Sequence, residues 1–219
     1  MIEKIKYDEN IKTPLCEIMY RNKSDKGNIN LIHNNHNYTN LYYDIFKTIQ
    51  FNNLKLFELG LGTNNENILS SMGRDGRPGA SLYGWNEFFI NSKIYGADID
   101  SNILFNTDNI KTFYCDQTNP YIIKNMWNNN LLECQFDIII DDGLHTFAAN
   151  ECFFENSIHK LNKNGYYIIE DIREIDFKLF INKIDEWKIK YPYLTFRFID
   201  LEISNDKNSD NNILLIRYI

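Results

Sequence analysis

The stretch KLFELGLGT at residues 55–63 joins a short apolar run to a turn that contains two glycines. Short apolar runs bounded by glycine are typical of buried strands. Similar runs follow at 94–100, 112–116, 136–140 and 165–171, and helical spacing of apolar residues separates several of them. This alternation predicts an α/β domain whose parallel sheet is covered by helices on both faces.

The two ends of the chain differ from this central pattern. Two further strands are expected at 194–201 and 212–219, and the polar turn between them predicts that they pair antiparallel. Residues 1–40 are Asn-rich, with one helix near 13–21, and an amphipathic helix starts at Tyr38. We therefore expect an N-terminal cap or lid at 1–40 and a domain at 41–219, with a mostly parallel sheet of seven strands.

Composition limits the classes of function. The 219 residues suit one domain, and 43% hydrophobic residues exclude a disordered chain. A net charge of -7 without a basic run argues against nucleic-acid and membrane partners and favours a small-molecule or saccharide partner. No apolar run is long enough to cross a membrane and the four cysteines form no motif, so we expect a cytoplasmic protein with reduced thiols.

Acidic residues follow every one of the first five expected strands. In an open parallel sheet, ligands bind beyond the carboxyl ends of the strands. Carboxylates are costly to bury without a partner, so chance placement explains five such ends poorly. The acids are Glu58, Asp98, Asp100, Asp116, Asp141, Asp142, Glu170 and Asp171.

The first three of these strand ends predict an adenosine-type cofactor. Gly60 and Gly62 allow close approach of the backbone to a ligand, although a plain tight turn needs the same residues. Asp98 could accept hydrogen bonds from a ribose, and Asp116 with Gln117 could address an adenine amino group. The alternative is that these are unrelated surface carboxylates.

The last two strand ends predict a metal ion. Adjacent strands lie about 5 Å apart, so Asp142, Glu170 and Asp171 can converge and would repel one another without a cation. A divalent ion with oxygen ligands, Mg²⁺ first and Mn²⁺ next, resolves that repulsion, whereas in the other interpretation the acids only cap the following helices. His145 follows Asp142 by three residues and could act as a general base, the alternative being a surface histidine.

ELGLGT at 58–63 resembles the first motif of the class I S-adenosylmethionine-dependent methyltransferases. The chain is also similar to the metal-dependent sugar O-methyltransferases of the macrocin and mycinamicin type and to the cephalosporin-hydroxylase-like group. That similarity lies in GRPGASLYGW (76–85), IYGADID (94–100), IIDDGLH (139–145), IIEDI (168–172), SDK (24–26) and HNYTNLYYDIF (36–46). The resemblance implies a Rossmann-like fold, the metal ligands Asp142, Glu170 and Asp171, and an N-terminal segment with Tyr38 folded over the cofactor. The mycinamicin-type enzymes carry a large extra N-terminal domain, whereas here we expect only the cap at 1–40 ahead of the methyltransferase domain.

These inferences predict an O-methyltransferase that modifies a hydroxyl of a sugar or sugar-linked acceptor, in surface-polysaccharide or natural-product biosynthesis. His145 and Asp142 are the expected catalytic residues. The expected cofactors are S-adenosylmethionine and a divalent ion, Mg²⁺ or Mn²⁺. An inactive cofactor-binding scaffold subunit and an NAD-dependent oxidoreductase are the alternatives, the latter disfavoured by Asn65 in place of a third glycine. The acceptor, the methylated position and homo-oligomerisation stay open. The expected cofactor contacts are Tyr38, Glu58, Gly60, Gly62, Ser81, Asp98, Asp100, Asp116, Gln117 and Asp141.

Overall fold

The computed structural model describes all residues except 1, 9, 28–35 and 203–209. Within the described residues, the strands are β1 (Ile2–Lys6), β2 (Lys55–Leu59), β3 (Lys93–Asp98), β4 (Ile110–Tyr114), β5 (Phe136–Asp141), β6 (Leu161–Ile169), β7 (Leu194–Glu202) and β8 (Asn212–Tyr218). The helices are α1 (Pro14–Arg21), α2 (Tyr38–Phe46), α3 (Ala80–Phe88), α4 (Pro120–Trp127), α5 (Phe147–Ser157) and α6 (Phe177–Lys190).

All the described strands form one sheet in the order β1-β7-β8-β6-β5-β2-β3-β4. Every neighbouring pair is parallel except the two that involve β8, which runs antiparallel to β6 and to β7. The predicted fold class is therefore confirmed. The sheet has eight strands because β1, which the sequence analysis did not predict, pairs parallel with β7 at the edge.

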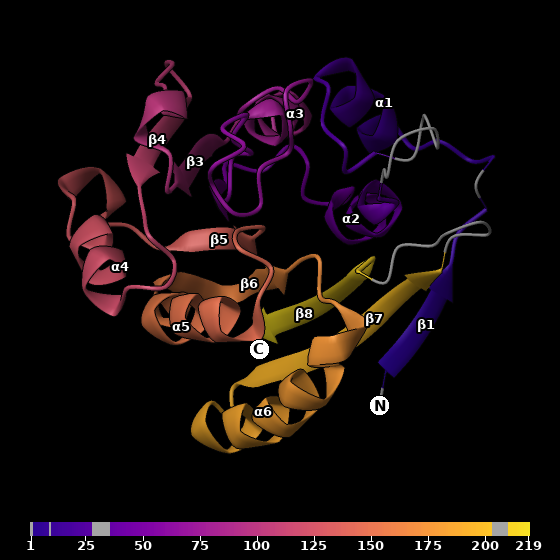
Figure 1. The fold of residues 1–219 in the computed structure, drawn as a ribbon. Coiled ribbons are helices and arrows are strands. Elements are labelled where there is room, and N and C mark those ends of the chain that lie inside the picture. Colours follow the sequence, from indigo (N-terminus) through magenta and orange to yellow (C-terminus); the bar gives the residue numbers. More distant parts are fainter. Residues whose placement is uncertain (1, 9, 28–35, 203–209) are drawn as a thin grey trace.

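Helices cover both faces of the sheet (Figure 1): α1, α2 and α3 lie on one face, and α4, α5 and α6 on the other. Consecutive strand residues point to opposite faces, so Leu56 and Phe57 of β2 belong to two separate apolar clusters. Leu56 packs in the cluster that contains Trp85 of α3, and Phe57 in the one that contains Phe153 of α5. The nearly all-apolar central strands are explained by this double burial.

The N-terminal residues pack into the domain. Residues 2–6 belong to the sheet, and Leu15 and Met19 of α1 are fully buried in the same cluster as α2 and α3. The boundary at residue 40 stays a prediction, and part of the predicted lid, at 28–35, lies outside the described residues. So does most of the predicted turn between β7 and β8.

Helix α4 was also missed by the sequence analysis, although its start carries the usual signals. Asn119 is the N-cap, accepting hydrogen bonds from the backbone N–H groups of Tyr121 and Ile122, and Pro120 occupies the first helical turn. No helix among the described residues is long and apolar enough to cross a membrane. The four cysteines are free, in agreement with the prediction.

Candidate active site

The candidate site lies where the carboxyl ends of β2, β5 and β6 meet. β2 is flanked by β3 on one side and β5 on the other, so the chain reverses its direction of winding between β2 and β5. Such a point is where open α/β sheets bind ligands. Asp142 directly follows β5, and Glu170 and Asp171 follow β6.

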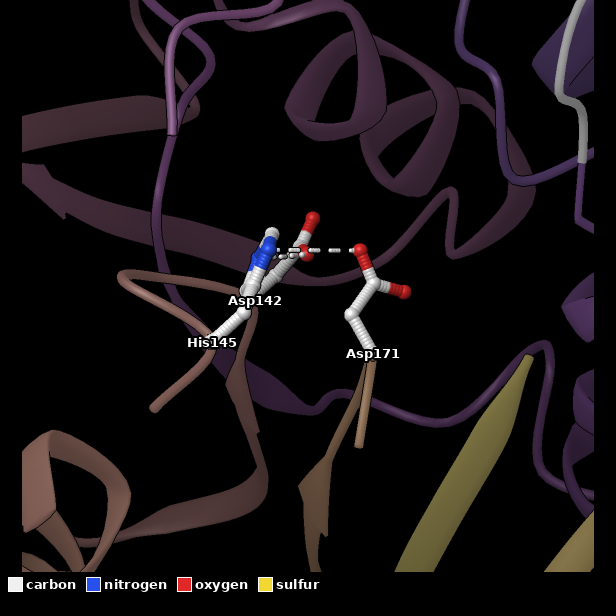
Figure 2. A group of neighbouring side chains, drawn as sticks. All are labelled: Asp142, His145 and Asp171. Atoms are coloured by element: carbon white, nitrogen blue, oxygen red, sulfur yellow. Dashed lines mark hydrogen bonds and ion pairs between the residues drawn. The ribbon is translucent and has the colours of Figure 1, made fainter. Parts of the chain in front are cut away.

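Three predicted residues converge there (Figure 2). Asp142, His145 and Asp171 each offer a ligand atom, and these atoms lie within 4.8 Å of one another. His145 stands between the carboxylates: its Nε2 is 3.2 Å from Oδ1 of Asp142, and its Nδ1 is 3.5 Å from Oδ2 of Asp171. We call these three residues the acid–histidine cluster.

Backbone conformation creates this cluster. His145 and Asp171 have φ values of 55° and 54°, in the left-handed region that L-residues adopt rarely. Strained backbone of this kind persists only where surrounding contacts hold it, and it concentrates at functional sites. For Asp171 one such contact is a 2.6 Å hydrogen bond that the Tyr38 hydroxyl donates to Oδ1.

Glu170 does not join the acid–histidine cluster, although the sequence analysis expected it there. Its carboxylate is fully buried and accepts hydrogen bonds from the Tyr42 hydroxyl and from Nζ of Lys26. The next residue, Asp171, lies instead beside His145 and Tyr38, as expected for consecutive residues at a strand end. Two of the three predicted ligands thus converge, and a metal contact of Glu170 stays a prediction.

Lys26 is the residue of the site that reasoning from the residues missed. Its side chain is 3% exposed, and its Nζ lies 2.5 Å from Oδ2 of Asp142, in contact with Glu170 and 3.7 Å from Oε1 of Glu58. The sequence did hold a signal, because several acids expected in one buried place require positive charge nearby. SDK at 24–26 is one of the strings that carry the family resemblance, but that resemblance assigned Lys26 no role.

Charges in the cluster shift the pKa values of its members. Burial favours the neutral form of Asp142, but Lys26 and His145 together hold its pKa below the usual range. Burial would lower the pKa of His145, and Asp171 and Asp142 outweigh it and raise that pKa to about 10. Without a bound cation the imidazole is therefore protonated at neutral pH.

The residues fit a hard divalent ion. Asp142 and Asp171 provide two converging carboxylates beside an imidazole, and Mg²⁺ is commonly held by one or two carboxylates with water completing its shell. A cation between these carboxylates would also relieve their mutual repulsion. His145 currently supplies that positive charge, which makes it the group a metal ion would compete with.

The glycines of the loop after β2 are required by protein neighbours. Gly60 has φ of 89°, and a Cβ there would overlap the backbone carbonyl of Asp142 on the adjacent strand end. Gly62 has φ of 74°, and a Cβ there would meet the thioether of Met72. The chain thus makes a tight turn at Gly60 and Gly62, which was one of the two explanations considered for these glycines. Their contact with a ligand stays a prediction.

Glu58 and Ser81 are joined by a hydrogen bond between their side chains. Glu58 is fully buried and accepts hydrogen bonds from the Ser81 hydroxyl, at 2.5 Å, and from the Trp85 indole N–H. Burial raises the pKa of Glu58, an effect that Lys26 partly offsets. These bonds fasten α3 to the end of β2, and cofactor contacts of both residues stay predictions.

Asp98 and Asp100 organise the same loop from the neighbouring strand. Asp98 accepts hydrogen bonds from the backbone N–H of Leu61 at 2.7 Å and of Asp100 at 2.8 Å. Asp100 accepts one from the Thr63 hydroxyl at 2.6 Å, which holds its pKa below the usual range. Oδ1 of Asp100 also accepts two hydrogen bonds from Asn102, through its backbone N–H and its side-chain amide. Both acids lie at the predicted edge of the sheet, and a ribose contact of either residue stays a prediction.

Asp141, Gln117 and Asp116 have different surroundings. Asp141 is fully buried and accepts hydrogen bonds from Gln117 Nε2 at 2.6 Å and Asn150 Nδ2 at 3.0 Å, and burial raises its pKa to about 6. It therefore accepts from two side-chain amides near the turn, and a cofactor contact of Asp141 stays a prediction. Gln117 in turn accepts from the Leu144 N–H, while Asp116 caps its own turn through Thr118. An adenine contact of Gln117 or Asp116 stays a prediction.

Tyr38 is part of the core and touches the acid–histidine cluster. It is 1% exposed at the start of α2, and its ring stacks on that of His36 with centroids 4.5 Å apart. His36 Nε2 lies 3.6 Å from Asp171, so Asp171 has three aromatic or imidazole neighbours: His36, Tyr38 and His145. A role of Tyr38 in covering the cofactor stays a prediction.

Comparison with known proteins assigns the fold. The structure is similar to that of MycE, a methyltransferase from the mycinamycin biosynthetic pathway solved with Mg, S-adenosylhomocysteine and mycinamycin VI. The TM-score is 0.68 with 21% identity, over 94% of this chain and 55% of that one. The fold is therefore that of the class I S-adenosylmethionine-dependent methyltransferases, as the first motif predicted.

Proteins with similar sequences include O-methyltransferases that act on glycosylated natural products. A rhamnosyl tetracenomycin-C 2'-O-methyltransferase from Streptomyces olivaceus is 26% identical over 172 residues, which cover 78% of this chain and 41% of that protein. Demethylmacrocin O-methyltransferase from Streptomyces fradiae is 32% identical over 94 residues, 43% of this chain and 23% of that protein. The chain thus spans less than half the length of these relatives, and no family model matches it. The resemblance to sugar O-methyltransferases is confirmed.

Proposed function

We propose that this protein is an S-adenosylmethionine-dependent O-methyltransferase that uses a divalent metal ion and methylates a hydroxyl of a sugar or sugar-linked acceptor. The observation that supports this most directly is the acid–histidine cluster at the carboxyl end of the sheet, beside the glycine turn after β2. The relatives that act on glycosylated natural products favour the sugar as the acceptor.

The proposed reaction is an in-line displacement. The acceptor oxygen forms a bond to the methyl carbon, the carbon–sulfur bond breaks, and S-adenosylhomocysteine leaves with the electron pair. The acceptor hydroxyl proton passes to Nε2 or Nδ1 of His145, the two ring nitrogens that face Asp142 and Asp171. Much of the acceleration comes from alignment of the three reacting atoms, and general-base catalysis adds about 10²–10⁴-fold.

A bound Mg²⁺ or Mn²⁺ would lower the pKa of the acceptor hydroxyl, and Asp142 and Asp171 are the residues that would hold it. His145 must lose its proton before it can accept one, and its pKa of about 10 reflects the negative charge of Asp171 and Asp142 beside it. With a cation held by Asp142 and Asp171, the pKa of His145 would fall, and its imidazole could then accept the acceptor's proton.

Binding and turnover measurements test this function. We expect S-adenosylmethionine and S-adenosylhomocysteine to bind the purified protein in calorimetry and NAD not to bind. Methyl rhamnosides and rhamnosylated polyketides, incubated with the protein and Mg²⁺, should yield S-adenosylhomocysteine, and a chelator should suppress the reaction. Absence of binding by both adenosyl compounds would overturn the proposal.

We further place the protein in the cytoplasm, where S-adenosylmethionine is made, in a pathway of natural-product or surface-polysaccharide modification. The natural-product relatives support the first of these pathways. Glycosyltransferases encoded beside the gene would support a glycan acceptor in either.

A further inference from the structure

Lys26 is a buried lysine whose ammonium group contacts three carboxylates. Its whole side chain is 3% exposed, and its Nζ contacts Asp142, Glu170 and Glu58 at once. Burial by itself would lower the pKa of Lys26, but the three carboxylates hold it well above the ordinary value. The group is therefore a permanent positive charge inside the site.

The backbone around Lys26 is fixed by neighbouring elements. The backbone N–H of Ser24 donates to the carbonyl of Met19 in α1, and the N–H of Thr39 in α2 donates to the carbonyl of Lys26. The Lys26 N–H donates to the Ser24 hydroxyl. Lys26 is thus held between the end of α1 and the start of α2.

Asp142 connects Lys26 to the acid–histidine cluster. One carboxylate oxygen, Oδ2, faces the ammonium at 2.5 Å, and the other, Oδ1, faces His145 at 3.2 Å. Each side of this carboxylate is therefore occupied by a cationic group, which fixes its rotation. Loss of either group would leave this half-buried carboxylate with one cationic partner in place of two.

We propose that Lys26 is a positioning residue whose ammonium group holds Asp142 and Glu170 in place before a divalent ion binds. The same positive charge weakens the binding of that ion. The inference rests on the proposed function, because it concerns the metal site of that function. The Lys26 ammonium and a bound divalent ion would both contact Asp142, so their positive charges would repel each other at close range.

Calorimetric titration with Mg²⁺ alone tests the proposal. Lys26→Met removes the charge and should tighten Mg²⁺ binding by about tenfold or more, because like-charge repulsion at this distance is lost. A residue that only filled space could not produce tighter binding. Lys26→Arg keeps the charge and should stay within about threefold of the wild type.

Lys183 provides a matched control. It forms ion pairs with Glu151, Glu155 and Glu186, three carboxylates on α5 and α6. Lys183→Met should leave Mg²⁺ affinity unchanged. Lys26→Gln serves as a second neutral variant if Lys26→Met does not fold, because its amide can still donate to one carboxylate.

The outcomes separate this inference from the proposed function. Wild-type binding with unchanged or weaker binding in the folded neutral variants overturns the role of Lys26 and leaves the proposed function standing. Binding in the neutral variants alone supports the role of Lys26 and removes the metal from the proposed function. Absence of binding in all variants overturns both.

Discussion

At the scale of single residues, His145 shows how a local charge pattern decides what a side chain can do. An unperturbed imidazole is largely neutral at physiological pH and ready to accept a proton. Here Asp142 and Asp171 raise its pKa to about 10, so the metal-free protein holds it as a cation. Its function as a base therefore depends on what occupies the neighbouring carboxylates.

Mg²⁺ binding should release a proton from His145. Because its pKa is raised in the free protein, the imidazole is protonated below about pH 10, and a cation on Asp142 and Asp171 lowers that pKa. In mildly alkaline solution the heat of Mg²⁺ binding should then differ between buffers of different ionisation enthalpy. The His145→Gln variant should show no such difference, and equal heats for the wild type in both buffers would contradict this.

His145→Ala should reduce methyl transfer by about 100-fold or more, because the proton acceptor is removed. S-adenosylmethionine affinity should stay within about threefold, since the described contacts of His145 are with Asp142 and Asp171. Formation of S-adenosylhomocysteine measures the first quantity and calorimetry the second. His159→Ala, in the turn at 158–160 before β6, is the control, and undiminished turnover of His145→Ala would reject the role.

At the scale of elements, the site is built by three strand ends that approach one another closely. The loop after β2 passes so near β5 that Gly60 lies against the backbone carbonyl of Asp142. The N–H of Asp142 also donates to the carbonyl of Leu59, and the N–H of Glu170 to that of Asp141. These bonds carry the ladder hydrogen bonding beyond the strands into the site, which keeps the acidic residues in register.

Gly60→Ala should destabilise the protein by more than about 3 kcal/mol, because its Cβ would combine a left-handed φ with overlap against backbone. Gly73→Ala separates the two effects: Gly73 also has a positive φ, of 76°, but a Cβ there meets nothing within 4 Å. This control should lose only about 1 kcal/mol. Urea unfolding measures both, and equal losses would show that overlap with Asp142 does not matter.

At the scale of the whole molecule, the sheet lies between two apolar clusters, one under each layer of helices. The rings of Phe57, Trp127, Phe136 and Phe153 are in contact within one of them. Because both faces of β2 are buried, each of its side chains supports one layer of helices. The carboxyl end of the sheet is thereby held rigid under the site.

Phe57→Ala should lower the free energy of unfolding by about 3–5 kcal/mol, because it removes a fully buried ring from the centre of the larger cluster. Phe51, which is 66% exposed, is the matched control, and its change to Ala should stay within about 0.5 kcal/mol. Chemical denaturation of both variants measures the difference. Similar midpoints for the two would contradict the assigned core.

Sequence pattern alone was sufficient for the alternation of strands and helices, the antiparallel closing pair and the acids at the strand ends, because each depends on residues close together in the chain. It missed β1, whose residues are exposed or half-buried without a clear period and which joins the sheet by pairing with β7. The geometry of the site was predicted in part: Asp142, His145 and Asp171 converge.

Only the tertiary structure decided how the charges of the site are balanced. Lys26 and Asp142 lie 116 positions apart, and nothing in the local sequence of either residue indicates the other. Glu170 and Asp171 are likewise neighbours in the chain with different partners, Lys26 and Tyr42 for the first and Tyr38 and His145 for the second. Local pattern specifies which elements form, because hydrophobic periodicity acts over a few residues, whereas compensation of buried charge is settled only when distant segments meet.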